Sequence, residues 1–384
     1  MTRFAVTYRL VSLGRKQTPV KDSVEIVRIR RQAIIRHMPL LPPPFSPDLK
    51  VLVLAGSEAL PTQDTCRLDV RDHPEVPLAG KAFLKLRGRL VVERVLDLLE
   101  ATGLHQIWVL GPRVCLEQIP TRYAFTPLHQ SPGASLAANL RAAQEAVEMA
   151  EDEPVLTIFG DHPLITATAL IDFLGLCGPL LEEADYFHGL ALREAYADYA
   201  PYFQRTSVLT REAAGRATGL NLIVPSRLHR VPAFDHIYSV RKLEQVGRFL
   251  NMLVRELYLL GDSGPAAVFD SLRLYIAKEF EKLSRHRGIL GKIGCSGMDW
   301  LRRQVSVTRI ERYAARLLGA ERGVRVIPVA HGGTAIDVDF AEELATLEEH
   351  WETLVALAHE QDEASRAAHR AIHADLTTPA AGGR

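Results

Sequence analysis

The sequence predicts an α/β fold in which a mixed, mostly parallel sheet has helices on both faces and carries a helical insertion. Short, continuous apolar runs such as 49–56 and 154–160 are typical of strands that are buried on both faces. Amphipathic stretches alternate with these runs, which favours parallel strands joined by crossover helices. From about 238 to 320 three amphipathic stretches follow one another with no strand between them, and this pattern indicates the insertion.

The expected elements follow in chain order. The predicted strands are 49–56, 105–112, 154–160, 185–193, 219–225 and 323–330. The first predicted helix, 88–103, has apolar residues at helical spacing and ends at a glycine. The second, 135–151, begins with Ser135 as its N-cap and keeps its apolar residues on one face. A C-terminal helix is predicted at 346–366, after the last strand.

The composition is that of an ordinary globular protein without electrostatic bias. The 384 residues include 46 Lys and Arg and 46 Asp and Glu, so the net charge gives no reason to expect nucleic acid or a membrane surface as a partner. The cysteines show no zinc-site spacing and are expected to be reduced thiols in a cytoplasmic protein. They are Cys66, Cys115, Cys177 and Cys295. No apolar run suits a membrane span or a signal peptide.

Both ends of the chain differ from the region between them. Residues 1–47 contain nine Lys and Arg against Asp22 and Glu25, and they end in a Pro-rich stretch. This composition suits either a basic arm for an anionic partner or a loosely ordered extension joined by a linker, and we favour the second. Residues 367–384 are expected to form a disordered tail.

The stretch TIFGDHPLIT, residues 157–166, places a carboxylate at the end of a buried strand. Ligands of open α/β sheets bind beyond the carboxyl ends of the strands, so Asp161 could hold Mg²⁺ beside bound phosphates. The alternative is that Asp161 only caps the following turn or helix. The neighbouring His162 could contact the ligand, although such a histidine more often packs or caps. The stretch alone leaves both interpretations open.

A second pair of carboxylates lies in AIDVDFAEEL, residues 335–344. Asp337 and Asp339 alternate with Val338, so in an extended backbone both side chains point to one face. One aspartate would be enough to cap the helix that follows, and two on one face favour a metal contact. We therefore expect this pair to lie across a cleft from Asp161.

The loop after the first strand is long, polar and rich in turn residues. Backbone amides after Gly56 could bind phosphates. Lys81 or Lys85 could reach a triphosphate as a mobile positive charge. An Ala-Gly pair after a strand and surface lysines are both common, so this loop indicates little on its own.

Six segments of the chain stand in a characteristic order. They are VLVLAG, GKAFLKLRGRLVVERVLDLL, GASLAANLRAA, FGDHPLIT, RTSVLT with TGLN, and DVDFAEEL. In this order they resemble the NTP-transferase superfamily of MobA-like nucleotidyltransferases, in particular a bacterial branch with a helical insertion. The resemblance implies a Rossmann-like sheet of the nucleotide-diphospho-sugar transferase type over residues 48–345, with the insertion at about 238–320.

The resemblance also implies roles for individual residues, with Lys81 and Asp161 as the catalytic pair. It assigns nucleotide binding to Ala55, Gly56, Ser57, Lys81, Gly133 and Asn139. It assigns metal binding to Asp161, Asp337 and Asp339, and acceptor binding to Arg205, Thr206, Gly219 and Asn221. The chain departs from the family at Ser57, where a second glycine is usual, and in FAEEL, where the family has TPEDL.

The implied activity is transfer of a nucleotidyl group from an NTP to a phosphorylated small-molecule acceptor, with release of pyrophosphate and with Mg²⁺ or Mn²⁺ as cofactor. This chemistry depends on positioning and charge neutralisation, so it needs no protein nucleophile. Nucleic acid and a membrane span are not expected, and the insertion could mediate a homo-oligomer. Two alternatives stay open: a glycosyltransferase of the same fold that uses a nucleotide sugar, and a non-catalytic nucleotide-binding protein.

Overall fold

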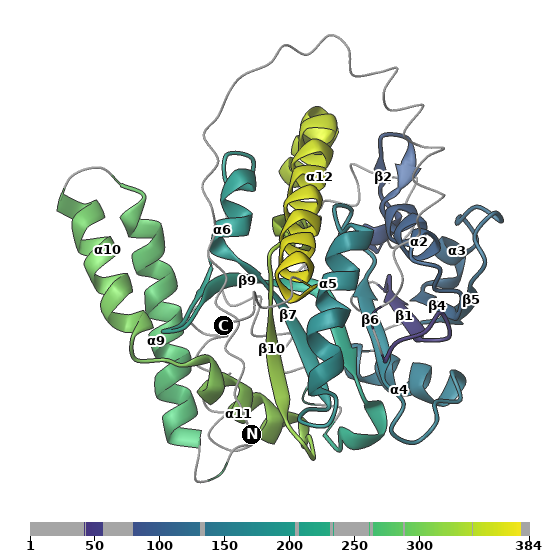
Figure 1. Cartoon of the computed structure of the whole chain (residues 1–384), viewed down its shortest axis with the longest axis horizontal. Coiled ribbons are helices and arrows are strands. Elements are labelled where there is room, and N and C mark those ends of the chain that lie inside the picture. Colours follow the sequence, from purple (N-terminus) through teal and green to yellow (C-terminus); the bar gives the residue numbers. More distant parts are fainter. Residues whose placement is uncertain are drawn as a thin grey trace, which may run out of the picture. The chain divides into compact units, whose positions relative to one another are not determined.

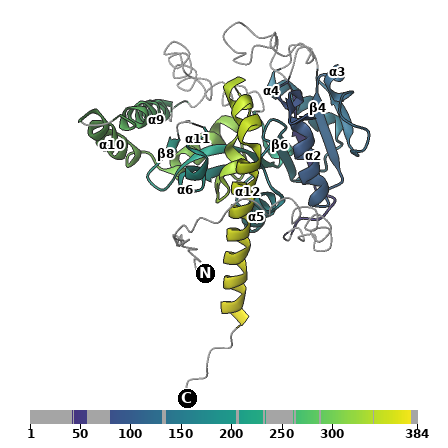
Figure 2. The same ribbon diagram turned by 90° about the horizontal axis from the view of Figure 1, so that it is seen from above.

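The computed structural model describes residues 42, 44–56, 80–130, 135–203, 207–230, 233, 261, 264–286, 289–339 and 341–377. The chain divides into two units, residues 1–38 and 39–384, and all of the described residues belong to the second. The predictions for most of residues 1–47, for the first part of the insertion and for residues 378–384 lie outside the described residues. Figure 1 and Figure 2 show the chain in two perpendicular views.

An eight-stranded sheet has the strand order β10-β7-β9-β6-β1-β4-β5, with β8 paired to β9. Its strands are β1 (Lys50–Leu54), β4 (Ile107–Gly111), β5 (Thr126–His129), β6 (Val155–Phe159), β7 (Tyr186–Leu192), β8 (Val208–Leu209), β9 (Ala214–Ile223) and β10 (Val324–Val329). All neighbouring pairs are parallel except those of β9, which runs antiparallel to β6, β7 and β8. The sheet is therefore mixed and mostly parallel, which confirms the predicted fold class (Figure 1).

Two of the strands that sequence reasoning shortened or missed, β9 and β5, contain polar or exposed residues. β9 begins at Ala214, well before the predicted strand 219–225. Its first residues are polar or small, so the apolar pattern did not reveal this part of the strand. β5 was not predicted, since it is mostly exposed at one edge of the sheet. A short hairpin of β2 (Lys85–Leu86) and β3 (Arg89–Leu90) turns through Arg87 and Gly88, whose positive φ angles are typical of a two-residue hairpin loop.

Helices cover both faces of the sheet. They are α2 (Val91–Ala101), α3 (Arg113–Leu116), α4 (Leu136–Ala146), α5 (Ala167–Cys177), α6 (Arg193–Tyr196), α9 (Gly264–Ser284), α10 (Ile289–Arg302), α11 (Val307–Leu318) and α12 (Ala341–Thr377), with the 3-10 turns η2 (Lys81–Phe83), η3 (Gly178–Leu180), η4 (Ala197–Tyr199), η5 (Pro225–Arg227) and η7 (Gly332–Ala335). Side chains of α2, α5 and α12 share one core cluster with the sheet, and those of α4 and α11 share another.

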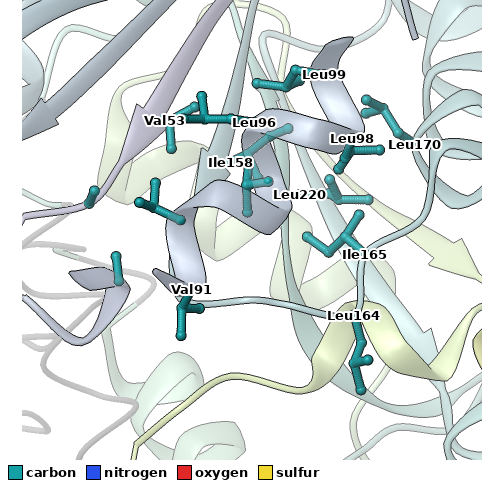
Figure 3. Close-up of a cluster of buried hydrophobic side chains, with 14 of the residues drawn as sticks. Val53, Val91, Leu96, Leu98, Leu99, Ile158, Leu164, Ile165, Leu170 and Leu220 are labelled. Carbon is teal, nitrogen blue, oxygen red and sulfur yellow. The ribbon is translucent and has the colours of Figure 1, made fainter. Parts of the chain in front are cut away.

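Successive residues of one strand belong to these two different cores. Val51 and Val53 of β1 lie in the cluster under α2, α5 and α12, whereas Leu52 lies in the cluster under α4 and α11. Figure 3 shows part of the first cluster, in which Leu96 of α2 lies with Val53 and Ile158. Because side chains alternate along a strand, a strand buried on both faces has to be apolar throughout, and this explains the continuous apolar runs in the sequence.

Local features explain where several helices begin and end. Ser135 Oγ accepts the Ala138 N–H at 3.2 Å, as expected for the predicted N-cap of α4. This helix ends at Ala146, before the predicted end at 151, and the chain then takes positive φ angles at Glu148 and Asp152. The last helix extends to Thr377, so part of the predicted tail is helical, in agreement with its high content of alanine.

The described part of the insertion is helical. α9 and α10 pack against each other, and α11 packs against β10. Buried Asp270 of α9 forms an ion pair with Arg309 at 2.9 Å and accepts a hydrogen bond from Tyr313 at 3.2 Å, which joins α9 to α11. Large apolar side chains are exposed on α9 and α10: Phe269, Ile276, Ile289, Leu290, Ile293 and Trp300. Formation of a homo-oligomer through this region stays a prediction.

Candidate active site

Six of the strands run in the same direction and end at one edge of the sheet, which we call the carboxyl edge; they are β1, β4, β5, β6, β7 and β10. The chain beyond β1 is bonded to both neighbours there. The Ala55 N–H donates to the Leu110 carbonyl at 2.9 Å, and the Gly160 N–H donates to the Leu54 carbonyl at 2.9 Å. The residues after β1 therefore lie beside the end of β6, which Asp161 follows.

The short turn η2 carries Lys81 to the same edge. A Cβ at Gly80 would lie 2.7 Å from the Ala55 carbonyl oxygen, and a Cβ at Gly160 would lie 3.2 Å from the Cβ of Ala55 and of Ala82. The approach at Gly80 requires glycine and the one at Gly160 is tight, so the end of β1, the end of β6 and η2 pack directly on one another. Lys81 is the first residue of η2, and its position follows from this packing.

The aspartates near the end of the domain reach this place as well. The Val338 N–H donates to the backbone carbonyl of Asp161 at 3.2 Å. Lys81 Nζ forms an ion pair with Asp339 Oδ1, and buried Asp337 is close enough to Asp161 to affect its ionisation. The structure thus brings together four of the predicted site residues, although Asp339 is far from Lys81 in the sequence.

The site carries an excess of negative charge. Burial raises the pKa of Asp161 above its ordinary value, and the carboxylates of Asp337 and Asp339 raise it further, whereas His162 and Lys81 act in the opposite direction. The net shift is upward, so the nearby cations do not fully offset burial and the two carboxylates. An additional cation at this position would relieve the repulsion.

The donor chemistry of this cluster fits Mg²⁺. In the described part of the chain, no three His, Cys, Asp or Glu side chains are arranged to hold a metal ion by themselves. Mg²⁺ does not need such a cage, because it is usually bound by one or two carboxylates and keeps its other positions for water and phosphate oxygens. Asp161 and Asp339 offer carboxylate oxygens at the carboxyl edge, and the charge around Asp161 favours a cation.

His162 is packed and hydrogen-bonded rather than exposed at this edge. Its Nδ1 lies 3.0 Å from the Thr334 carbonyl oxygen, which can only accept, so Nδ1 is the donor. Its Nε2 lies 3.7 Å from Asp161 Oδ1. A Cβ at Gly219 would lie 2.8 Å from two atoms of the His162 ring. Gly219, predicted on the acceptor side, therefore leaves the space that this imidazole occupies.

A group of polar side chains lies on β7 and β9 near the predicted acceptor residue Asn221. Asn221 is buried, and its Oδ1 accepts hydrogen bonds from Tyr186 Oη at 3.0 Å and from His188 Nδ1 at 2.6 Å. Sequence reasoning missed Tyr186 and His188, although two polar rings spaced by two residues in a buried strand were a usable signal. Arg205 and Thr206 lie outside the described residues.

The predicted nucleotide contacts are only partly described. A Cβ at Gly56 would lie 2.7 Å from Gln130 Oε1, so the backbone passes close to the end of β5. Asn139 is buried on α4, one turn before Ala143, which belongs to the core cluster on that face of the sheet. Ser57 and Gly133 lie outside the described residues.

Comparison with known proteins gives solved structures of low identity. A hypothetical transferase from Thermus thermophilus is 24% identical, with 77% of this chain and 99% of that chain covered and a TM-score of 0.47. A CMP:2-keto-3-deoxy-manno-octonic acid synthetase complexed with CTP is 14% identical, with 80% and 98% covered and a TM-score of 0.39. A 4-diphosphocytidyl-2C-methyl-D-erythritol synthase from Anaerococcus prevotii is 9% identical, with 79% and 96% covered and a TM-score of 0.36.

The sequence itself gives a family match. No curated protein matches the chain significantly. Residues 79–182, however, match the family described as MobA-like NTP transferase domain, and this range includes Lys81, Asn139 and Asp161. None of the helices in the described ranges combines the length and the apolar character that crossing a membrane requires. Residues 79–182 therefore match a MobA-like NTP transferase domain, and this match supports a nucleotidyltransferase.

Proposed function

We propose that the protein transfers a nucleoside monophosphate group from an NTP to a phosphorylated small-molecule acceptor, releases pyrophosphate and depends on Mg²⁺ or Mn²⁺. The observation that carries this proposal is the convergence of Asp161, Asp337 and Asp339 with Lys81 at the carboxyl edge. Phosphoryl transfer needs a cation site and a positive side chain around the reacting phosphates, and this cluster supplies both.

The nucleotide is expected to lie beyond β1. In the proposal, Ala55, Gly56 and Ser57 lie along the triphosphate. The backbone N–H groups of Gly56 and Ser57 bind it, because amides at a strand–loop junction are suited to anions and the Ala55 N–H already donates to the Leu110 carbonyl. Lys81 is a flexible point charge, and its ion pair with Asp339 supports a role at the carboxylates. We expect Nζ to turn from this carboxylate to a phosphate oxygen when the nucleotide binds.

The nucleoside itself has two further proposed contacts, Gly133 and Asn139. They belong to the beginning of α4 and to the segment before it. Asn139 is buried, and an amide side chain there could read the hydrogen-bonding edge of a base. The choice among the four NTPs would depend on these contacts.

The proposed reaction is a single in-line displacement. An oxygen of the acceptor phosphate attacks the α-phosphorus opposite the bond to the β-phosphate. The new P–O bond forms as the α–β bridge breaks, and the bonding electron pair leaves with pyrophosphate. Bound Mg²⁺ would neutralise and align the phosphates, with Asp161 and Asp339 as its ligands and Asp337 beside them. Lys81 would stabilise the charge that develops on the leaving pyrophosphate.

The acceptor is expected on the β9 side of Asp161. Two observations support this: Gly219 lies against the ring of His162, the neighbour of Asp161, and Asn221 accepts hydrogen bonds from the polar rings of Tyr186 and His188. Arg205 and Thr206 precede β8 and would bind the acceptor phosphate. Because arginine binds phosphate through a planar pair of N–H groups, Arg205 is the proposed anchor of that group.

The test is an assay of pyrophosphate release with each of the four NTPs, Mg²⁺ and a panel of phosphorylated small molecules, followed by identification of the product by mass. We expect turnover with one preferred NTP and no turnover for Asp161→Ala. Asp152→Ala is the matched control, because Asp152 is an exposed carboxylate before the other end of β6. A requirement for a nucleotide sugar would support the glycosyltransferase alternative, and NTP binding without turnover would support a non-catalytic protein.

A further inference from the structure

A buried group of ionisable side chains lies outside the proposed site, and we call it the His331 cluster. It consists of His331, Asp172 of α5 and Asp362 of α12. The His331 ring is almost fully buried, with its Nε2 2.7 Å from Asp172 Oδ2 and its Nδ1 3.4 Å from Asp362 Oδ1. Three ionisable groups from three separate parts of the chain thus meet in the interior.

The hydrogen-bonding and ionisable neighbours of the cluster come from the start of α5, from η4 and from α12. Ser365 Oγ donates to Asp172, and Thr166 Oγ1 donates to Asp362 at 2.6 Å. His369 of α12 is exposed, with its Nδ1 3.8 Å from Asp172 Oδ1. Tyr199 of η4 is buried near Asp362, whose charge contributes to raising the pKa of the phenol. These neighbours satisfy the carboxylates, and none of them carries a second positive charge into the interior.

The cluster favours a positively charged histidine. Burial alone would lower the pKa of His331, but the hydrogen bond with Asp172 and the charges of Asp172 and Asp362 outweigh it and raise the pKa to about 9. The imidazolium therefore offsets the carboxylates of Asp172 and Asp362 at neutral pH. Loss of this proton would leave both carboxylates beside a neutral ring, without the positive charge that offsets them.

Hydrogen bonds connect the His331 cluster to the proposed site. We call residues 331–339 the aspartate segment, because it ends in the two aspartates. The His331 carbonyl accepts the Thr334 N–H at 3.3 Å and the Thr334 hydroxyl at 2.6 Å. The Thr334 carbonyl accepts Nδ1–H of His162 at 3.0 Å. At the other end of the segment, the Val338 N–H donates to the Asp161 carbonyl.

The long helix α12 holds the segment at a second point. The Gly332 N–H donates to Gln361 Oε1 at 2.8 Å, and Gln361 Nε2 donates to the Ala195 carbonyl at 2.6 Å. A Cβ at Gly332 would lie 2.2 Å from the same Ala195 carbonyl oxygen, so only glycine fits there. The start of the aspartate segment is therefore held on both sides, by α6 and by α12.

We propose that the His331 cluster positions the aspartate segment against Asp161. In this inference His331 touches no substrate and acts through the backbone that it anchors. The inference rests on the proposed function, since the segment matters because of its two carboxylates. The inference also gives α12 a second role: besides packing on the sheet, this helix holds the start of the aspartate segment in place.

The test uses the full chain and two readouts that need no turnover. His331→Gln removes the charge and keeps a polar side chain. We expect faster hydrogen–deuterium exchange across the aspartate segment and a Kd for Mn²⁺ that rises about 10- to 100-fold, as is typical when a partner behind a metal ligand is removed. His369→Gln is the matched control, because it removes another histidine near Asp172 that is not part of the aspartate segment. In this variant the exchange rates and the Kd for Mn²⁺ should stay at the wild-type values.

The pH dependence separates positioning from general packing. In the wild type, protection of the segment, corrected for the intrinsic exchange rate, should fall as pH passes through about 9, because His331 then loses its proton. In His331→Gln the same profile should be flat in this range. Asp362→Asn serves as the second variant if His331→Gln does not fold, and it should also loosen the segment.

Unchanged exchange and unchanged Mn²⁺ affinity in a folded His331→Gln variant would overturn the inference. Equal loosening in His369→Gln would also overturn it, because the effect would then not depend on the anchored backbone. Absence of NTP turnover in the wild type would count against the proposed function alone, since neither exchange nor Mn²⁺ binding requires turnover.

Discussion

Lys81 Nζ is ion-paired with Asp339 Oδ1, so the turn η2 is joined to the second aspartate of the aspartate segment. Both side chains are about one-third exposed, with 31% and 33% of their surfaces accessible. A partly exposed ion pair of this kind contributes little to the free energy of unfolding. Its value lies in placing a mobile positive charge next to the carboxylates that we propose as metal ligands.

Replacement of Lys81 tests this relationship. We expect Lys81→Met to lower kcat by about 100-fold or more, because the loss of one charged donor at a developing phosphate charge typically has an effect of this size. Steady-state kinetics with the preferred NTP measures it. Lys282→Met is the control, since Lys282 is an exposed lysine of α9 that pairs with Glu279 three residues away, and its kinetics should stay unchanged. Equal kcat values for both variants would remove Lys81 from the mechanism.

Asp161 should show a trade-off between activity and stability. Its raised pKa means that ionisation is unfavourable in the folded protein, so a neutral side chain of the same shape should be better tolerated. We expect Asp161→Asn to abolish turnover and to raise Tm in the absence of metal, by roughly 2–4 °C for each kcal/mol gained.

Thermal unfolding of Asp161→Asn and Asp152→Asn in metal-free buffer gives the comparison. The pKa of Asp152 is lowered by its hydrogen bond with Arg227, so neutralising it should leave Tm unchanged or lower it. A fall in Tm for Asp161→Asn would mean that its ionised form is stabilised rather than strained.

The stability of the protein should depend on pH through His331. The folded-state pKa of about 9 lies above the ordinary value of 6.5, so the stabilisation is fully present below pH 6.5 and is lost as pH rises to about 9. This interval corresponds to roughly 3 kcal/mol. Urea unfolding at a series of pH values measures it, and the slope in this range should be absent in His331→Gln. The same slope in both proteins would assign it to another group.

Gly219 should be required because of the ring beside it. A Cβ at this position would meet His162 at 2.8 Å, so we expect Gly219→Ala to lower the free energy of unfolding by about 1–3 kcal/mol, as overpacking does. The matched control is Gly175→Ala in α5, where the added Cβ would have only ordinary contacts at 3.8 Å, and this change should stabilise by up to about 1 kcal/mol. Denaturant unfolding of both variants gives the comparison.

A double variant shows whether the contact itself is responsible. Shortening His162 to alanine makes room for the added Cβ, so the cost of Gly219→Ala should be much smaller in the His162→Ala background than in the wild type. Additive costs would show that the glycine is needed for another reason.

Some features of the candidate site could be predicted because they depend only on neighbours in the sequence. Asp161 follows a continuous apolar run, and such a run ends at the edge of the sheet where ligands bind. Asp337 and Asp339 share a face by their spacing alone. Tyr186 and His188 show the same spacing in β7, and they were missed because the strand was interpreted only as a buried one.

Other features depend on contacts between distant parts of the chain. The antiparallel direction of β9 has no signature in its residues, because alternation along a strand is the same in both directions. The partner of Lys81 and the charge of His331 likewise depend on carboxylates that are remote in sequence, Asp339 in one case and Asp172 with Asp362 in the other.

The sequence by itself determined the class of the fold, the edge at which ligands are expected and the acidic residues available there, since periodicity and strand ends are local properties of the chain. Only the tertiary structure decided which of these charges meet, that Lys81 faces Asp339, and that His331 is held as a buried cation at the start of the aspartate segment. The physical reason is that ionisation and metal binding depend on distances and burial, which folding sets between residues far apart in the sequence.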